Sequence, residues 1–476
     1  MIGISRACRR FAATAILGMT LCQAMLAQSS TDAKNSVFTL EEAVEFALKN
    51  YPAVRASLER ASAARSGVIL ARTNYLPRAD MLWQGNRATR NNIFGLLLPQ
   101  STIPSISGPV LPTTSNRGVW GTAAGLLFSW EPFDFGRRRA QVESARAAET
   151  RTDAQVELTR LDVGAATVNA YLTLLAAEQS VHAAQADVQR REVLSHSVHT
   201  LVSSQLRPGA DASRADAELA RAKAGLARTQ QQEAVSRAVL TDILGIADVR
   251  VEVQGGPLLG PPPELETVGP GISTHPLAEV QQARVQEQSS QVRVLDRAYY
   301  PKFNFQSAVY GRGTGANTDG SFAGGTSGLG IDRSNWAVGL SVTFPALDIF
   351  SIRARKRIET SNQRAEAARY DQTIQDLTGR LREAQASLEG ARRVAESTPV
   401  ELSAARTAEE QERIRYQAGL ATIVEVSDAQ SLLVQAETDD VLARLAVWQN
   451  LAAVAASRGD LRPVLQFLHG KTQGEP

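Results

Sequence analysis

The stretches that decide the fold are Asn50–Tyr51–Pro52–Ala53–Val54 and His275–Pro276–Leu277, in each of which a proline opens a helical segment. Each segment closes on a second proline, in Tyr75–Leu76–Pro77 and in Tyr299–Tyr300–Pro301. One offset, 224, relates both pairs of equivalent prolines (276 − 52 and 301 − 77). Proline is favoured in the first turn of a helix and stops a helix that reaches it, so this spacing marks a duplicated unit. A repeat of this size sets the architecture and indicates a scaffold or transport role rather than a reactive centre.

After each closing proline the sequence period changes from helical to two, which predicts strands at about 78–90, 118–131, 302–311 and 334–345. One face of the clearest strands is apolar, and the other carries small or polar residues. The apolar faces hold Trp120, Thr122, Ala124, Leu126, Phe128 and Trp130 in the first half and Trp336, Val338, Leu340, Val342 and Phe344 in the second. Such strands have about the length, roughly 9–11 residues, that crosses a bilayer when tilted. The alternative is a sheet packed on the core of a soluble domain, but four isolated strands lack an obvious partner layer.

Long helical patterns follow the strands, and we expect helical hairpins at about 135–245 and 350–458. Apolar residues recur every seven positions at Leu161, Val168 and Leu175, a spacing that indicates coiled-coil packing. Turns at Arg207–Pro208–Gly209 and Ala418–Gly419 would fold each long pattern back on itself. The sequence therefore divides into a first repeat (28–248), a linker (249–271), a second repeat (272–460) and a C-terminal tail (461–476).

Positions 1–27 have the pattern of a signal peptide. A basic beginning is followed by an apolar segment that falls short of the roughly 20 residues of a transmembrane anchor, which is the alternative reading. Both cysteines, Cys8 and Cys22, lie in this segment, so the mature chain is expected to have neither disulfides nor thiolate metal sites. Leu21 disfavours lipidation of Cys22, because a lipoprotein cleavage site requires a small residue there.

Composition and motifs argue against several functional classes. The 51 basic and 49 acidic side chains nearly balance, so nothing points to nucleic acid. His196 and His199 are three residues apart, but no third ligand follows at a recognisable spacing, and exposed histidines are the simpler interpretation. Gly311–Arg312–Gly313 lacks the helix start and the Lys–Ser/Thr pair of a phosphate loop. We therefore expect no enzyme, no cofactor and no metal site.

The order of helix, strand, strand and long helical hairpin resembles the TolC family of outer-membrane efflux proteins, the outer membrane factors of tripartite efflux and type I secretion systems. The resemblance covers essentially all of the mature chain. The segments that carry it are Phe38–Thr39–Leu40–Glu41–Glu42–Ala43, the two Tyr–Pro corners, Phe133–Asp134–Phe135–Gly136–Arg137–Arg138, Tyr416–Gln417–Ala418–Gly419 and Glu425–Val426–Ser427–Asp428–Ala429–Gln430.

This resemblance implies an α+β membrane protein that forms a homotrimer. Four strands from each chain would close a twelve-stranded β-barrel in the lipid of the outer membrane, and the hairpins would continue it as an α-helical barrel through the periplasm. The channel would be a passive exit duct for substrates delivered by an inner-membrane pump of the RND or ABC type and a periplasmic adaptor. The competing hypothesis is a periplasmic coiled-coil adaptor without a membrane barrel.

The resemblance also assigns roles near the hairpin tips. It places Tyr416, Glu425 and Asp428 at the periplasmic aperture, where threefold symmetry would gather the two acids into rings that favour cations. The alternative is that Glu425 and Asp428 are ordinary exposed helix acids. The sequence departs from the family pattern at Ala421, where an arginine occurs in other members.

The tips themselves are implied to dock the periplasmic adaptor. The positions concerned are Arg207, Pro208, Gly209 and Gly419.

Overall fold

The computed structural model describes residues 36–89, 116–246, 250–263, 271–317, 319, 321 and 323–472, so the predicted signal peptide lies outside the described residues. The chain forms two compact units. One consists of Met1–Ala56, Glu157–His275 and Gln375–Pro476, and the other of Ser57–Val156 and Pro276–Ile374. Each unit therefore takes segments from both halves of the sequence.

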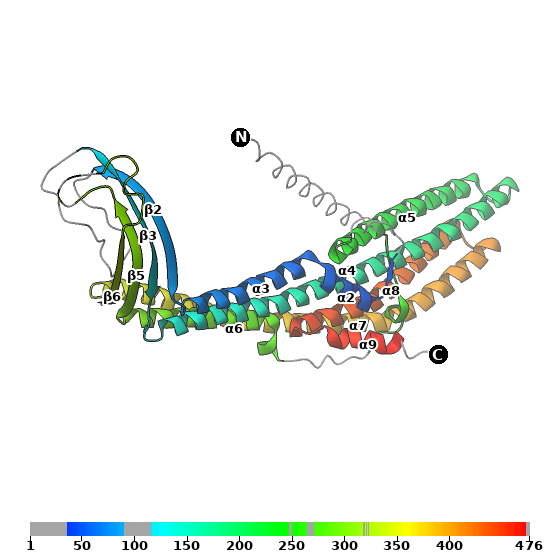
Figure 1. The fold of residues 1–476 in the computed structure, drawn as a ribbon. Helices are drawn as coiled ribbons and strands as arrows, with labels where there is room; N and C mark the ends of the chain where they lie inside the picture. Colours follow the sequence, from blue (N-terminus) through cyan, green and yellow to red (C-terminus); the bar gives the residue numbers. More distant parts are fainter. Residues whose placement is uncertain are drawn as a thin grey trace, which may run out of the picture. The chain divides into compact units, whose positions relative to one another are not determined.

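The duplication is visible in the order of the elements (Figure 1). The first copy consists of α3 (Pro52–Thr73), β2 (Arg78–Thr89), β3 (Gly118–Trp130), α4 (Arg137–Ser203) and α5 (Gly209–Leu244). The second consists of α6 (Pro276–Asp296), β5 (Lys302–Thr314), β6 (Arg333–Thr343), α7 (Asp348–Gln417) and α8 (Ile423–Arg458). The long helices match closely, because α4 has 67 residues against 70 in α7, and α5 and α8 have 36 each. The internally duplicated fold is thus confirmed.

The strands form one antiparallel sheet in the order β2–β3–β5–β6. Its register pairs Arg78 with Ser129, Trp130 with Phe305 and Lys302 with Thr343. The four strand termini that connect to helices therefore lie at the same end of the sheet. Within the described residues β2 and β6 each pair on one side only, which leaves the sheet open at both lateral edges.

One face of this sheet is apolar and exposed, because directly paired residues of an antiparallel sheet point to the same side. Met81, Trp83 and Trp336 are 83, 73 and 77% exposed. The same face holds Leu126, Trp130, Val309, Val338, Leu340 and Val342. On the opposite face, Leu127 and Tyr310 are buried with two small alanines in a cluster of their own. The sheet thus has a wide apolar side that no described segment covers.

The corner between β3 and α4 is fixed by one carboxylate. Asp134 accepts hydrogen bonds from the backbone N–H of Gly136 (3.2 Å) and Arg138 (2.6 Å), which satisfies groups that a helix start leaves free. The buried Arg138 side chain pairs with the same carboxylate at 2.8 Å and donates to the carbonyl of Asn74 at 3.3 Å. Phe135, which has a positive φ of 52°, stacks on Tyr300 of the second copy with ring centroids 5.0 Å apart.

The core of the helical unit gathers α2 (Leu40–Asn50), parts of α4, α5 and α8, and a small parallel sheet of β1 (Ser36–Phe38) and β4 (Val251–Val253). Thr39 and Glu42 form the capping box of α2. Tyr171 is fully buried on α4, and its hydroxyl lies 2.9 Å from the carbonyl of Phe38 and 2.8 Å from that of Gln254. Burial raises the pKa of this hydroxyl, so it stays protonated and its single proton is shared between the two carbonyls.

Two segments are more ordered than the sequence suggested. The predicted C-terminal tail (461–476) contains α9 (Arg462–Thr472), and Leu461, Val464 and Leu468 are buried in the core of the helical unit. The linker contributes β4 and the short 3₁₀ helix η1 (Gly256–Leu259). Two further 3₁₀ helices lie beyond it: η2 (Ile272–Thr274) directly follows the linker, and η3 (Arg297–Tyr299) follows α6. These contacts are long-range in sequence, which is why local patterns did not reveal them. Among the described residues, none of the helices combines the length and apolarity needed to cross a bilayer.

The Tyr171 hydroxyl generates a stability prediction. In Tyr171→Phe the two carbonyls and the Gln254 N–H lose their buried partner, which costs about 1–3 kcal/mol. We expect a lower melting temperature in differential scanning fluorimetry of the purified protein. Tyr370→Phe, which makes the same change at a half-buried site, is the control and is expected to melt like the wild type. Equal melting temperatures for all three proteins would contradict this role of Tyr171.

Candidate functional site

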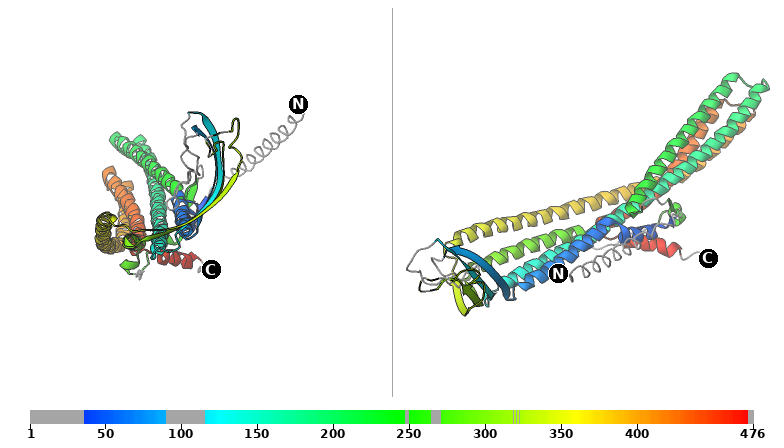
Figure 2. Two further views of the ribbon diagram at one scale, coloured as in Figure 1. Left: turned by 60° about the vertical axis from the view of Figure 1, so that its left-hand side comes forward. Right: turned by 45° about the horizontal axis from the view of Figure 1, so that its top comes forward.

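The two hairpin tips are built in the same way. Gln205 (φ 61°) and Gly419 (φ 78°) adopt the left-handed conformation that ends α4 and α7. The next residue donates its backbone N–H to a carbonyl one turn back in each case, from Leu206 to Leu201 at 2.9 Å and from Leu420 to Arg415 at 2.8 Å. This is the Schellman arrangement for satisfying terminal helix carbonyls. An offset of 214 relates the two turns (419 − 205), and Figure 2 shows α4 and α5 side by side where the first turn joins them.

Arg207 connects the two tips. Its guanidinium lies over the ring of Tyr416, with 4.4 Å between the guanidinium carbon and the ring centroid. It also donates to the carbonyl of Tyr416 at 2.8 Å and to that of Ala421 at 3.4 Å. The offset of 214 makes Arg207 the first-half counterpart of Ala421, whose carbonyl it contacts. The guanidinium of Arg207, which the sequence analysis assigned to adaptor docking, lies against the predicted aperture residue Tyr416.

Tyr416 is buried at the centre of this contact, with 2% of its surface exposed. Its hydroxyl donates to the carboxylate of Asp211 on α5 at 3.5 Å, and burial raises its pKa. Apolar residues from both tips surround it: Val198, Ala212, Ala215, Ala421, Ile423 and Val426. Sequence analysis missed Asp211, which the same offset pairs with Glu425 (425 − 211). The two hairpins of one chain are therefore joined by a buried aromatic ring, a guanidinium and a carboxylate.

Glu425 has a local structural role that the sequence analysis did not assign. Its carboxylate accepts from the backbone N–H of Thr422 at 2.6 Å, and Thr422 Oγ1 accepts from the N–H of Glu425 at 3.4 Å. This capping box begins α8, and its signal was present in the sequence as Thr422-x-x-Glu425. The hydrogen bond from the Thr422 backbone holds the pKa of Glu425 below its usual value, so the capped carboxylate is ionised at neutral pH and the cap weakens as pH falls through that lowered pKa.

Asp428, one turn further along α8, is exposed like Glu425, and both point away from the buried residues of this helix. Pro208 and Gly209 are exposed at the first tip and Gly419 at the second. Leu206 and Leu420 are 70 and 72% exposed in the two turns, and sequence analysis did not single them out.

Two further arginines join the hairpins away from the tips. Arg190 on α4 pairs with Glu437 on α8 at 2.9 Å. The buried Arg191 pairs with Asp187 at 3.0 Å and Glu218 at 3.1 Å, and donates to Ser431 on α8 at 3.1 Å. Because a buried guanidinium without partners is expensive, these bonds fix the helices' relative register.

His196 and His199 are both exposed, as the sequence analysis expected. His199 Nε2 lies 2.9 Å from the carboxylate of Asp216 on α5, and this hydrogen bond lowers the pKa of Asp216. His199 is therefore exposed but not unpaired, and it joins α4 to α5. In the part of the chain that the structure describes, no group of three or more His, Cys, Asp or Glu side chains is arranged to hold a metal ion.

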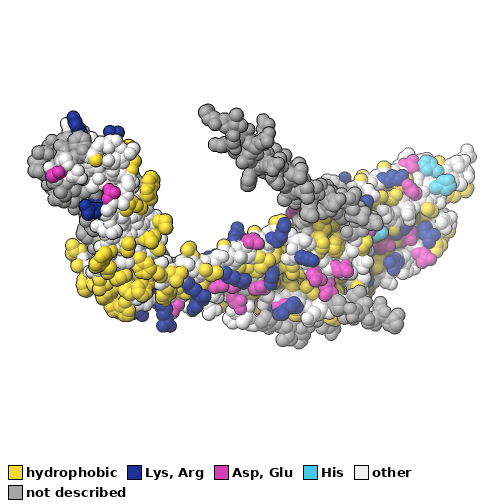
Figure 3. Space-filling view, in the orientation of Figure 1, with side chains coloured by type: hydrophobic (Ala, Val, Ile, Leu, Met, Phe, Trp, Pro, Cys, Tyr) yellow, Lys and Arg dark blue, Asp and Glu magenta, His cyan; other side chains and the backbone are white. Residues whose placement is uncertain are grey.

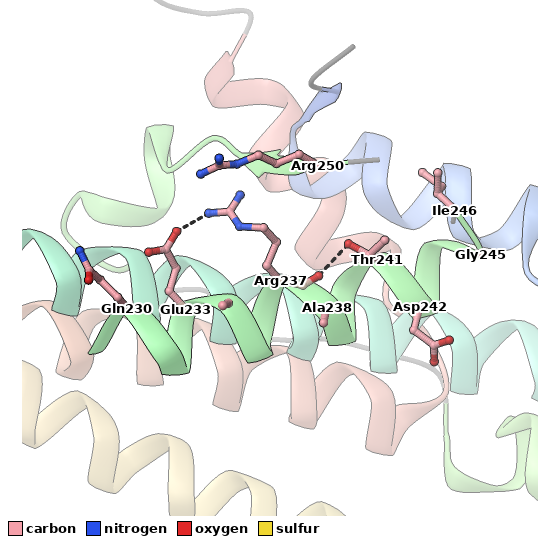
Figure 4. A pocket seen from close by; sticks show the side chains of 10 residues that line it. Gln230, Glu233, Arg237, Ala238, Thr241, Asp242, Gly245, Ile246 and Arg250 are labelled. Atoms are coloured by element: carbon pink, nitrogen blue, oxygen red, sulfur yellow. Dashed lines mark hydrogen bonds and ion pairs between the residues drawn. The ribbon is translucent and has the colours of Figure 1, made fainter. Parts of the chain in front are cut away.

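A groove on the helical unit runs along α5 and is lined by Gln230, Glu233, Ala234, Arg237, Ala238, Thr241, Asp242, Gly245, Ile246 and Arg250 (Figure 4). The guanidinium of Arg237, at the centre of the groove, already has partners within the protein. It pairs with Glu178 at 3.0 Å and with Glu233, and it donates to the carbonyl of Val251. The groove is therefore a surface depression, and its lining residues do not form a set of reactive groups.

Comparison with protein families decides the assignment. The family model described as outer membrane efflux protein matches residues 43–246 and 273–460, the two copies of the repeat. The chain belongs to the outer membrane efflux protein family. Protein CyaE of Bordetella pertussis (strain Tohama I) is 25% identical over 433 residues, which cover 89% of this chain and 84% of CyaE.

Solved channel structures share the fold. The CmeC outer membrane channel of Campylobacter jejuni has a TM-score of 0.70 at 15% identity, over 91% of this chain and 89% of that one. The outer membrane protein VceC of Vibrio cholerae gives 0.69 at 18%, over 88% and 96%. The MtrE channel of Neisseria gonorrhoeae gives 0.68 at 19%, over 89% of each.

Membership of the outer membrane efflux protein family confirms the functional prediction in outline. The protein is an outer-membrane channel for efflux or secretion, with its helical part in the periplasm. The family points to a transport duct rather than an enzyme, and its members form trimeric channels that work with adaptor proteins and inner-membrane pumps.

The Arg207 contact can be tested without reference to transport. Arg207→Ala removes the stacking on Tyr416 and two hydrogen bonds, a loss of roughly 1–3 kcal/mol from the contact between the tips. We expect faster amide hydrogen exchange in both turns, at 204–209 and 418–422. Arg214→Ala, which removes an exposed arginine from the first turns of α5, is the control and leaves exchange unchanged. Equal protection in both variants would show that Arg207 does not hold the tips together.

Proposed function

We propose that three copies of this chain close a twelve-stranded β-barrel in the outer membrane and continue it as a periplasmic helical barrel. The observation that carries the proposal is the open four-stranded sheet, with its unpaired β2 and β6 edges among the described residues and its exposed apolar face. Backbone groups at a sheet edge must be paired within lipid, and closure is the way a sheet achieves this. Pairing β6 of one chain with β2 of the next satisfies both edges at once.

The channel is proposed to be a passive duct powered by its partners. An inner-membrane pump of the RND or ABC type would deliver the substrate, and a periplasmic adaptor would dock at the tips, where Pro208, Gly209 and Gly419 are exposed. Leu206 and Leu420 add one exposed apolar side chain to each turn, which suits contact with an apolar partner surface. Arg207 serves this region by holding the two turns of each chain together.

The periplasmic aperture is proposed to be controlled by Tyr416, Glu425 and Asp428. The contact of Arg207 and Asp211 with Tyr416 joins the two hairpins of each chain, so opening requires this contact to rearrange. Asp428 is exposed and takes no part in the cap of α8, whereas the Glu425 carboxylate belongs to it. Symmetry would bring three copies of each acid toward the axis, where they favour cations.

The barrel proposal predicts a difference between the two faces of β6. Leu340→Arg places a charge on the exposed apolar face, at a cost of about 2–4 kcal/mol per chain near the bilayer midplane. We expect little heat-modifiable oligomer in the outer-membrane fraction on unheated SDS gels. Asn335→Arg, on the opposite face of the same strand, is the control and retains the oligomer. A wild-type protein found wholly in the soluble fraction, or equal assembly of both variants, would overturn the proposal.

The aperture proposal predicts that charge and capping are separable. Asp428→Asn removes an acid without touching the cap, and we expect weaker block by divalent cations in planar-bilayer recording. Thr422→Ala removes the capping hydroxyl, which costs about 1 kcal/mol, but leaves both acids in place. Its divalent block is expected to match the wild type. The double variant Glu425→Ala/Asp428→Ala should show the largest loss of block, and unchanged block in it would exclude both acids from the aperture.

A further inference from the structure

The apolar surface of the sheet continues past the end of β6 onto the start of α7. Phe344, Leu347 and Phe350 are 68, 82 and 70% exposed. Figure 3 shows hydrophobic side chains gathered over the strands, with Lys and Arg side chains where the helices leave them. Aromatic residues concentrate at the depth where lipid tails meet head groups. In the proposed barrel, the beginning of α7 therefore lies at the membrane boundary on the periplasmic side.

Two arginines follow Phe350 on the same side of α7. Arg353 and Arg357 are three and seven residues further along, which corresponds to a rise of roughly 4.5 and 10.5 Å. Both are exposed, and neither forms an ion pair with another described residue. The neighbouring Lys356 is instead paired with Asp296 at 2.6 Å. Like charges four residues apart on a helix repel each other, so the fold itself gains nothing from this pair.

The equivalent positions of the first copy hold an arginine and an acid instead of two arginines. The offset that relates the hairpin tips also relates Arg139 to Arg353 and Glu143 to Arg357 (353 − 139 and 357 − 143). Arg139 and Glu143 form an ion pair at 3.1 Å. In the first copy, the arginine is neutralised by an ion pair within the chain. The second copy has an arginine in place of the acid, so two positive charges remain available to a partner outside the chain.

We propose that Arg353 and Arg357 bind the head groups of anionic phospholipids in the periplasmic leaflet. The inference rests on the proposed barrel, which sets this part of α7 beside the membrane. The apolar side chains of Phe344, Leu347 and Phe350 lie against the acyl chains, and the guanidinium groups reach the phosphate oxygens, which they bind through paired N–H donors. Three chains provide three such sites around the barrel.

The test uses the full-length protein purified in a nonionic detergent. Binding of phosphatidylglycerol, phosphatidylethanolamine with the same acyl chains, and inorganic phosphate is measured by native mass spectrometry and by the shift in melting temperature. We expect selective, salt-sensitive binding of phosphatidylglycerol, weakened about fivefold for each arginine removed in Arg353→Gln/Arg357→Gln. Because that variant also loses the like-charge repulsion, it should melt no lower than the wild type when no lipid is added.

The matched control is Arg382→Gln/Arg406→Gln, which removes two exposed arginines further along α7 and is expected to keep wild-type lipid binding. Equal binding of the two phospholipids, or equal losses in both double variants, would overturn the proposal. Stabilisation by inorganic phosphate alone would replace a lipid site with a general anion site. Because assembly of the same preparations is followed on unheated gels, a failure of lipid selectivity in an intact oligomer counts against this inference and leaves the barrel in place.

Discussion

The constraint on which this structure depends is the pairing of backbone groups at the edges of a four-stranded sheet. In water the unpaired N–H and C=O groups of β2 and β6 would be hydrated, but in a bilayer they have no partner other than another strand. The exposed apolar face disfavours water as an environment for the same sheet. In the proposed barrel, one chain therefore carries an incomplete wall, and assembly follows from the backbone itself rather than being added to a finished monomer.

The periplasmic part follows a different principle. Its hairpins share an apolar core, and a few polar side chains with several partners each add specific connections between them. Arg191 is the clearest example, since it has ion-pair partners on α4 and α5 and a hydroxyl on α8. Arg207 is a second example at the tips, where its guanidinium stacks on the Tyr416 ring and its N–H groups donate hydrogen bonds to backbone carbonyls. Such contacts specify one arrangement of the helices.

The sequence predicted what is encoded locally. Pro52 and Pro276 begin helices, and Pro77 and Pro301 immediately precede strands, because a ring that fixes φ acts on its own neighbours. Alternation also identified the apolar face of β6. The contacts of the tips were beyond this reasoning, because Arg207 meets Tyr416 across 209 residues and no local pattern reports such a distance. The capping role of Glu425 was readable in Thr422-x-x-Glu425, but the family resemblance drew attention to its charge instead.

The two copies also differ in a way that bears on how such a chain can change. The connection between β2 and β3 runs over 90–117 and that between β5 and β6 over 315–332, so the first is the longer by ten. This difference equals the fall in the repeat offset from 224 at the prolines to 214 at the tips. The difference in length between the two copies thus arises in the connections between paired strands, at the end of the sheet away from the helices. The two copies differ in length there, whereas an insertion in one long helix would shift its tip relative to the five others of the proposed trimer.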